Sequence, residues 1–231
     1  MSTERVVLPA VMPHTVQELR AQLAQVLSYA PAVHLDIMDG LLVPSTSWPY
    51  SAGGLPAVVG TPQFSQTEAH LMVRSPRELG ELLVHAGIPS IIAQLEGFDD
   101  ADDAARAITA WRAAGAAHVG ISLMADTPLA AVAPVVNEID RLQIMTIART
   151  GFQGEPFDAR GLSRVHDTCA AHPGAVVCAD GAISQENIAQ LSLAGATRFA
   201  VGSAIIRATD PAAAYREIVA ALQTAATTDC S

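Results

Sequence analysis

The segment VHLDIMDG, residues 33–40, places one histidine and two acids within a run of apolar residues. If Val33–Ile37 forms a strand, His34 and Asp36 point to the same face, because strand side chains alternate with a period of two. An imidazole and a carboxylate on one face are ligand types that divalent transition metals prefer. This pair is therefore the first candidate for a functional site.

Two further residues of the same chemistry end or follow other apolar segments. His70 lies in EAHLMV and Asp180 closes AVVCAD. A single histidine or aspartate usually only satisfies local hydrogen bonds, so the prediction rests on all four residues together. Two imidazoles and two carboxylates from three strands predict one divalent ion, and this ligand set suits zinc, iron(II), manganese or cobalt alike.

Glycine-containing turns predict a second feature, a site for a phosphate group. TGFQGE, DGA and VGS each follow a predicted strand in the last third of the chain. Loops of this kind, with free backbone N–H groups beside a helix, bind phosphate in strand–helix barrels, although glycines also occur simply because a turn is tight. The candidates are Gly151, Phe152, Gln153, Gly154, Gly181, Ala182, Gly202 and Ser203.

Three methionines stand at or just past predicted strand ends: Met38, Met72 and Met145. A buried methionine usually only fills space in a core. Three of them around one candidate metal site predict an apolar wall that keeps water away from a reactive intermediate.

The elements that must position these residues are short apolar runs, each followed by a helical pattern. Eight such units predict a parallel sheet with right-handed crossovers, and in a chain of this length they indicate a single (β/α)8 TIM barrel. A doubly wound open sheet fits less well, because no glycine-rich dinucleotide turn follows the first run. The predicted strands are Val6–Met12, Val33–Ile37, Glu68–Val73, Ile91–Leu95, Val119–Leu123, Gln143–Ile147, Ala175–Ala179 and Arg198–Val201.

Helix boundaries are predicted from local signals. Thr15 with Glu18 and Ser75 with Glu78 form capping-box patterns, and Leu129–Val136 has a helical pattern after Thr127-Pro128. We expect one domain over residues 1–231, with a frayed tail at 221–231 and a long irregular loop at 45–64.

Composition excludes several classes of function. The 231 residues are 50% hydrophobic and 16% charged, with a formal net charge of −10, which argues against nucleic acid or an anionic membrane as partner. All thirteen basic residues are arginine, so lysine-dependent Schiff-base chemistry is excluded. The three cysteines lack metal-type spacing, and with no long apolar stretch they predict a cytoplasmic protein.

Taken in order along the chain, these motifs resemble the ribulose-phosphate 3-epimerase family. The resemblance rests on VHLDIMDG with Pro44, EAHLMV, IMT and GFQGEPF between residues 144 and 157, and ADGAI with GSAI between 179 and 205. It implies a TIM barrel that interconverts D-ribulose 5-phosphate and D-xylulose 5-phosphate through an enediolate at a divalent metal ion. The implied ligands are His34, Asp36, His70 and Asp180.

The resemblance also implies that Asp36 and Asp180 act as acid and base on opposite faces of C3. Met38, Met72 and Met145 match the methionines that the family places beside the intermediate. The implied partner is a small-molecule sugar phosphate, and members of the family commonly form homo-oligomers.

The sequence departs from the family pattern around the expected substrate. Ala10, Gln94 and Ala182 replace a serine, a histidine and a glycine, and Arg149 lies close to the expected phosphate loop. These changes leave open a 3-epimerase of another ketose phosphate, such as D-allulose 6-phosphate, or a non-catalytic sugar-phosphate-binding paralogue. A related decarboxylase is excluded because its signature requires a lysine where this chain has Met38.

Overall fold

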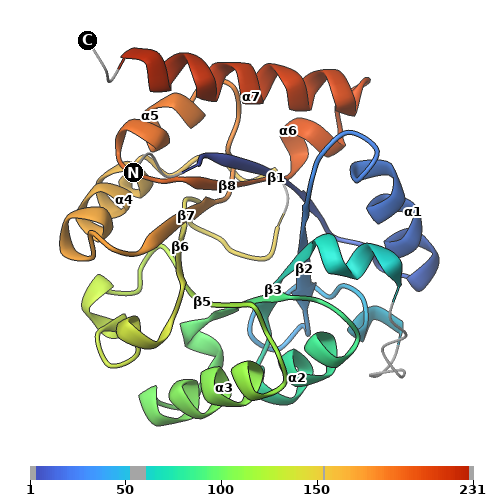
Figure 1. The fold of residues 1–231 in the computed structure, drawn as a ribbon, viewed down its shortest axis with the longest axis vertical. Coiled ribbons are helices and arrows are strands. Elements are labelled where there is room, and N and C mark those ends of the chain that lie inside the picture. The colour runs from blue at the N-terminus through green and yellow to red at the C-terminus, as the bar shows by residue number, and fades with distance from the viewer. Residues whose placement is uncertain (1–3, 53–60, 153, 229–231) are drawn as a thin grey trace.

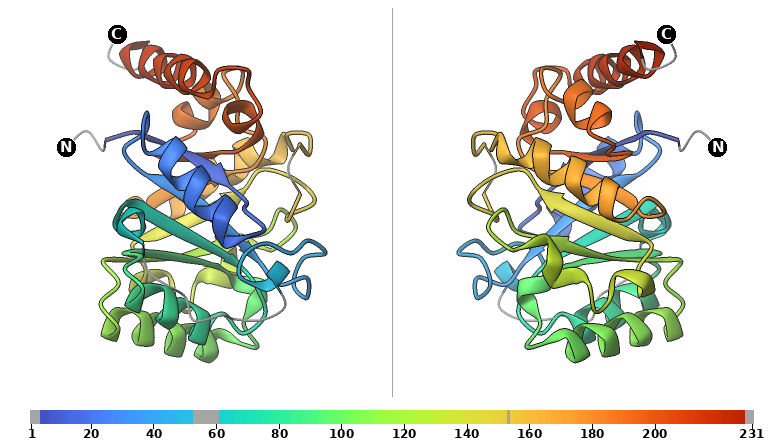
Figure 2. Two further views of the ribbon diagram at one scale, coloured as in Figure 1. Left: turned by 90° about the vertical axis from the view of Figure 1, so that its right-hand side faces the viewer. Right: turned by 90° about the vertical axis from the view of Figure 1, so that its left-hand side faces the viewer.

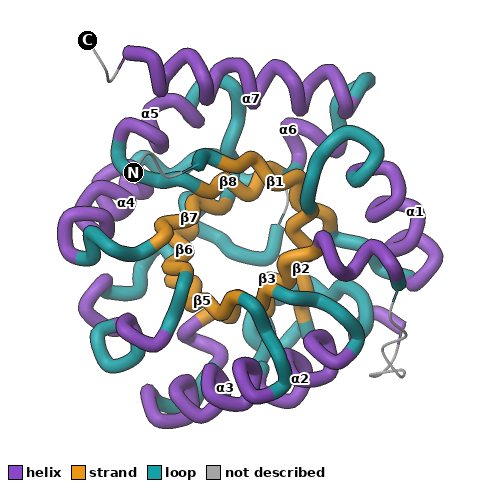
Figure 3. The backbone as a smooth tube through the Cα atoms, in the orientation of Figure 1, coloured by secondary structure: helices purple, strands orange, loops and turns teal. Residues whose placement is uncertain are grey.

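The computed structural model describes residues 4–52, 61–152 and 154–228, and its eight strands form one closed barrel. Neighbouring strands are parallel throughout, and β1 pairs with β8 to close the ring, as Figure 3 shows. This architecture confirms the predicted (β/α)8 fold. The strands are β1 (Val6–Val11), β2 (Val33–Met38), β3 (Thr67–Met72), β4 (Ser90–Gln94), β5 (His118–Leu123), β6 (Arg141–Met145), β7 (Val176–Asp180) and β8 (Arg198–Val201).

Helices surround the ring of strands on the outside (Figure 1), and the two side views in Figure 2 show α7 lying along one side of the barrel. They are α1 (Val16–Val26), α2 (Arg77–His85), α3 (Ala101–Ala113), α4 (Arg160–Ala171), α5 (Ile188–Leu193), α6 (Ser203–Ile206) and α7 (Pro211–Thr228). Within the described ranges, none of the helices combines the length and the hydropathy needed to cross a bilayer.

The two faces of each strand differ in chemistry, and this difference positions the site. Leu35 and Ile37 of β2 belong to the apolar core that the strands share with the helices. His34 and Asp36 alternate with them, so these two side chains point into the barrel. Strands β3, β6 and β7 follow the same pattern, which gives the barrel interior an unusual number of buried polar groups.

The predicted start of α1 is confirmed. Thr15 Oγ1 accepts a hydrogen bond from the N–H of Glu18 at 3.1 Å. The Glu18 carboxylate returns to the N–H of His14, at 2.7 Å, instead of the N–H of Thr15. The helix therefore begins where the capping pattern predicts.

Other local predictions were wrong. The expected capping box at Ser75 does not form, because Ser75 has a left-handed φ of 50° and α2 begins only after Pro76. The predicted helix Leu129–Val136 is instead two short 3-10 turns, Leu129–Val132 and Val136–Glu138, since Pro134 between them cannot donate a helical hydrogen bond.

The C-terminal prediction also needs correction. A frayed tail was expected at 221–231, but residues 221–228 continue α7, which is helical to Thr228, and residues 229–231 lie outside the described residues. Its alanine-rich sequence favours helix. Ile218 and Leu222 are buried against the barrel's outer core, which holds this part of the helix in place.

Candidate active site

The four residues predicted as metal ligands come together inside the barrel. Asp36 and His70 are partners in the register of β2 with β3, and Asp180 is the last residue of β7. Each of the four side chains, His34 included, offers one ligand atom, and all four atoms lie within 4.8 Å of one another. The barrel therefore gathers two imidazoles and two carboxylates around one point.

Four of the distances between these atoms are close to those that a four-coordinate cation requires. His70 Nδ1 lies 3.3 Å from Asp36 Oδ1 and 3.2 Å from Asp180 Oδ2. His34 Nε2 lies 3.5 Å and 3.7 Å from the same two oxygens. Ligands about 2.1 Å from a tetrahedral ion are separated by about 3.4 Å. The four atoms thus fit the coordination shell of a small divalent ion.

A second observation agrees with that fit. His34 is completely buried, and its Nε2 atom, which faces the centre of the four groups, has no hydrogen-bond partner. Buried polar atoms without a partner are rare and need an explanation. A cation bound among the four side chains would satisfy this nitrogen.

The carboxylates and imidazoles strongly influence each other's protonation. Burial alone would lower the pKa of His34, but the nearby carboxylates of Asp36, Glu68 and Asp180 outweigh burial and raise that pKa to about 10. For Asp36 burial would raise the pKa, yet the adjacent His34 and His70 rings lower it to about 2. Asp36 is therefore ionised at neutral pH, which is the state that a base or a metal ligand needs.

Three buried polar residues that the sequence reasoning did not assign support the four groups. Glu68 Oε1 lies 3.1 Å from His34 Nδ1, and Gln143 Nε2 donates to Asp180 Oδ2 at 3.0 Å. Gln94, oriented so that both ends of its amide are satisfied, accepts from His70 Nε2 at 3.2 Å. The alternation of polar and apolar residues in β3 and β6 was the signal that could have identified Glu68 and Gln143.

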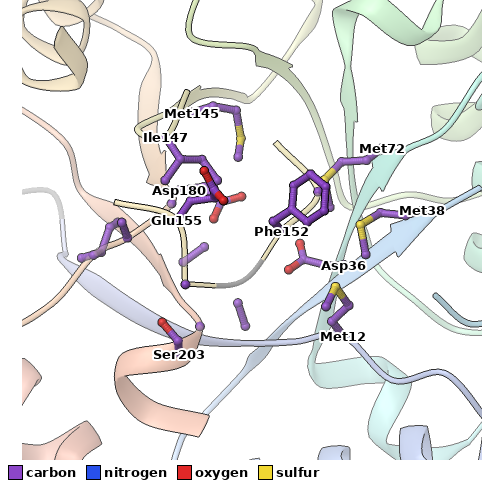
Figure 4. A pocket seen from close by; sticks show the side chains of 18 residues that line it. Met12, Asp36, Met38, Met72, Met145, Ile147, Phe152, Glu155, Asp180 and Ser203 are labelled. Carbon is purple, nitrogen blue, oxygen red and sulfur yellow. The ribbon is translucent and has the colours of Figure 1, made fainter. Parts of the chain in front are cut away.

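A cavity lies over the four groups, and Asp36 and Asp180 form part of its wall (Figure 4). The three predicted methionines, Met38, Met72 and Met145, all line it. Met12, which the prediction omitted, lines it as well, although its place just beyond β1 matches the rule that selected the others. Met38, Met72 and Met12 form an apolar cluster with Val43, so one side of the cavity is apolar.

The predicted phosphate residues surround the same cavity. Those that line it are Gly151, Phe152, Gly154, Gly181, Ala182, Gly202 and Ser203, while Gln153 lies outside the described residues. Gly181 has a φ of 116°, and a Cβ atom there would lie 2.8 Å from Ile147, so glycine is required for the turn after β7. Ala182, which follows it, also has a left-handed φ, of 51°.

Arg149 forms a two-point ion pair at the edge of the cavity. Its Nε and Nη2 atoms donate to the Glu155 carboxylate at 2.9 Å and 2.6 Å, and its guanidinium carbon lies 5.5 Å from the centre of the Phe152 ring. Glu155 lines the cavity, whereas 71% of the Arg149 side chain is exposed. Sequence reasoning identified Arg149 but missed its acidic partner.

Asp39 has a structural role. Its carboxylate accepts from the N–H groups of Leu41 and Leu42 and, at 2.7 Å, from that of Arg74. These bonds join the loop after β2 to the loop after β3. Trp48 of the long loop is buried against Phe64 in the core outside the barrel, with ring centres 6.2 Å apart, so this part of the loop covers the fold.

Comparison with solved structures supports the fold. The structure is similar to 3-hexulose-6-phosphate synthase from Salmonella typhimurium, with a TM-score of 0.64 at 19% identity over 95% of this chain and 99% of the other. It is also similar to KGPDC from Streptococcus mutans in complex with D-R5P, with a TM-score of 0.71 at 10% identity over 95% and 98% of the two chains. At such identities the likeness shows the barrel fold alone.

Sequence comparison goes further. Residues 6–206 match the ribulose-phosphate 3 epimerase family. Ribulose-phosphate 3-epimerase of Mycobacterium tuberculosis is 33% identical over 208 residues, 85% of this chain and 86% of the relative, and that of Treponema pallidum is 32% identical over 183 residues, 77% and 79% of the two. The predicted family is thereby confirmed, and the chain belongs to the ribulose-phosphate 3-epimerase family, whose members are isomerases acting on carbohydrates.

Proposed function

We propose that this protein inverts C3 of a ketopentose 5-phosphate in a metal-dependent reaction, interconverting D-ribulose 5-phosphate and D-xylulose 5-phosphate. The observation that carries the proposal is the pair of carboxylates, Asp36 and Asp180, which reach one cavity from β2 and β7 with His34 and His70 beside them. The names of the relatives and the predicted phosphate turns point to the same class of substrate.

The two carboxylates have the roles that inversion requires. One removes the C3 proton from one face of the substrate, and the other returns a proton to the opposite face. Asp36 is ionised at neutral pH because His34 and His70 lower its pKa to about 2. Gln143 holds Asp180 through a hydrogen bond of 3.0 Å and so fixes the second carboxylate relative to the first.

His34, Asp36, His70 and Asp180 would hold the metal ion, because their distances and the unpartnered His34 Nε2 fit one. A divalent cation there would supply positive charge that stabilises the negative charge developing on the sugar oxygens. Zinc, iron(II), manganese and cobalt all accept two nitrogen and two oxygen ligands. The two histidine rings also lie against the carboxylates of Asp36 and Asp180, which face the cavity.

The remaining cavity residues bind the substrate and exclude water. Met12, Met38, Met72 and Met145 present apolar groups to the enediolate and keep it from protonation by solvent. The phosphate would bind on the other side, at the turns containing Gly151, Gly154, Gly181, Ala182, Gly202 and Ser203, where backbone N–H groups replace the lysine that this chain lacks.

The test follows exchange of the C3 proton of D-ribulose 5-phosphate in deuterated water by NMR, with metal-loaded protein. We expect deuterium at C3 together with D-xylulose 5-phosphate, and a loss of at least about 1,000-fold in turnover for Asp180→Asn. Metal content must be measured for each variant, because Asp180 is also a proposed ligand. Asp102→Asn, on the outer helix α3, is the control and should retain wild-type turnover.

Two other results would contradict the proposal. Exchange without D-xylulose 5-phosphate would show that one carboxylate works and that the second proton transfer fails, which contradicts the two-carboxylate proposal. Absence of exchange with this substrate, despite bound metal, would overturn the choice of ketopentose and direct the assay to a panel of other ketose phosphates.

One feature favours a second candidate, a 3-epimerase of a larger ketose phosphate such as D-allulose 6-phosphate. Ala10 lines the cavity at the position where the family pattern has a serine, so its short side chain leaves additional room. A higher kcat/KM with the hexulose phosphate would establish this alternative, and binding without turnover across the panel would indicate a non-catalytic paralogue.

A further inference from the structure

Glu68 is a buried acid on β3 that has no part in the proposed proton transfers. Its side chain is 4% exposed and points into the barrel, where it lies opposite His34 in the register of β2 with β3. Glu68 Oε1 lies 3.1 Å from His34 Nδ1. It is thus in direct contact with one proposed metal ligand, on the side away from the metal.

Two arginines and a serine hold the other oxygen of this carboxylate. Oε2 accepts from Arg198 Nη2 at 3.1 Å, from Ser90 Oγ at 3.2 Å and from Arg141 Nη1. A buried carboxylate without partners would take up a proton, but two guanidinium groups favour the ionised form.

An ionised carboxylate can only accept hydrogen bonds, so His34 must donate from Nδ1. In the neutral ring, which is the form that binds a cation, Nε2 then carries the lone pair, and this is the atom that faces the other three groups without a partner of its own. Carboxylates that bind the far nitrogen of a histidine fix its tautomer and increase its basicity as a ligand.

His70 provides an internal comparison. Its Nδ1 faces Asp36 and Asp180, and its Nε2 is bound by the neutral amide of Gln94 at 3.2 Å. The two histidines therefore present opposite ring nitrogens to the centre, and only His34 has a charged group behind it.

We propose that Glu68, anchored by Arg141 and Arg198, is a positioning residue that fixes the His34 ring with Nε2 toward the metal and strengthens it as a ligand. The inference rests on the proposed function to the extent that the four side chains hold a cation. It also gives Arg141 and Arg198 a role: they act on the metal through Glu68 and His34, although neither arginine would contact the metal or the substrate.

The test measures metal affinity instead of turnover. Apoprotein is titrated with Co²⁺, and binding is followed by the visible absorption of the bound ion, for the wild type, Glu68→Gln and Glu68→Asp. Removing an acceptor of this kind typically weakens metal binding by about 10- to 100-fold. We expect that loss for Glu68→Gln and a smaller loss for Glu68→Asp, which keeps the charge but shortens the reach to His34.

A spectroscopic signature separates positioning from a general loss of structure. In Zn²⁺-loaded protein the His34 Nδ1–H proton should give a downfield NMR signal, which shifts upfield in Glu68→Gln. Cys178→Ala is the matched control, since Cys178 is a buried residue of β7 near the same carboxylate, and it should bind Co²⁺ within about twofold of the wild type.

Loss of charge at Glu68 leaves the buried Arg141 and the partly buried Arg198 without their acid, so Glu68→Gln can fail to fold. Circular dichroism shows whether it does, and Glu68→Asp then decides. A folded Glu68 variant with Co²⁺ affinity and His34 signal equal to the wild type would overturn the inference. Wild-type protein that binds Co²⁺ without epimerising any ketose phosphate would refute the proposed function but not this role. Wild-type protein that binds no divalent cation would refute this role, while turnover would still be judged by the exchange assay.

Discussion

At the scale of single residues, the ion pair of Arg149 with Glu155 determines the charge at the cavity edge. Glu155 lines the cavity, and its carboxylate would repel a phosphate group if Arg149 did not neutralise it. Because Arg149 is largely exposed, its effect on a bound phosphate is screened by salt.

Arg149→Ala should therefore raise KM for the phosphorylated ketose by about three- to tenfold at low ionic strength, with little change in kcat. The double variant Arg149→Ala/Glu155→Gln also removes the uncompensated charge of Glu155, so its KM should return most of the way to the wild-type value. Steady-state kinetics at two salt concentrations checks both statements. Equal KM values for the single and double variants would show that Arg149 does not act through Glu155.

At the scale of elements, α2 and α3 approach closely at Gly80. A Cβ atom on Gly80 would lie 2.1 Å from Nε1 of Trp111, a fully buried side chain whose Nε1 donates to the Arg77 carbonyl at 2.9 Å. Alanine favours a helix interior by about 1 kcal/mol over glycine, but overpacking costs about 1–3 kcal/mol.

Steric overlap outweighs helix propensity here, because the Trp111 ring is buried on all sides. We expect Gly80→Ala to lower the free energy of unfolding by about 1–2 kcal/mol, measured by urea denaturation. Gly174→Ala, where an added Cβ meets nothing within 4 Å, is the control and should change stability by less than about 0.5 kcal/mol. Equal or higher stability of Gly80→Ala would mean that α2 and α3 can separate freely.

The start of α4 gives a pH-dependent prediction. Asp158 Oδ1 accepts from the N–H of Arg160 at 3.0 Å, and the Arg160 guanidinium binds the same carboxylate. Arg160 thereby lowers the pKa of Asp158 below its ordinary value of 3.8. A carboxyl group with a lowered folded-state pKa stabilises the fold above its unfolded-state pKa, and this stabilisation is lost as pH falls through the folded-state value.

Asp158→Asn should therefore be less stable than the wild type at pH 7, and the difference should shrink as pH falls below about 4. Asp158→Ala, which also lacks the backbone acceptor, should lose about 1 kcal/mol more at every pH. Urea denaturation across this pH range provides the measurement. A constant difference between the wild type and Asp158→Asn would show that the carboxylate charge has no role.

At the scale of the whole molecule, the pattern of strands and the four convergent residues were predictable, but the pairing of polar groups inside the barrel was not. Period-two alternation places His34, Asp36 and His70 inside the barrel without any structure. Glu68 and Arg198 are 130 residues apart, and only the closed ring determines that they meet. Strand sequences such as RLQIM and RFAV do not reveal where a buried arginine finds its partner.

Local signals failed where longer-range packing decided the backbone. Ser75 resembles a helix cap, but its N–H donates to the carbonyl of Gly97, 2.9 Å away in the loop after β4, and the residue adopts a left-handed conformation. The segment after Pro128 has a helical pattern that Pro134 interrupts. Glu155 was missed because nothing in its sequence context distinguishes a cavity wall from a surface turn.

The parallel ring closed by β1 and β8 also has a consequence for how the chain refolds. His34, Asp36 and His70 come from the first half of the chain, but Asp180 joins them only when β7 pairs with β6. Contacts between residues so distant in sequence form late, because long loops must close first. In a stopped-flow refolding experiment, the visible absorption of bound Co²⁺ should therefore appear in the slowest folding phase. The metal would then report when the barrel is complete.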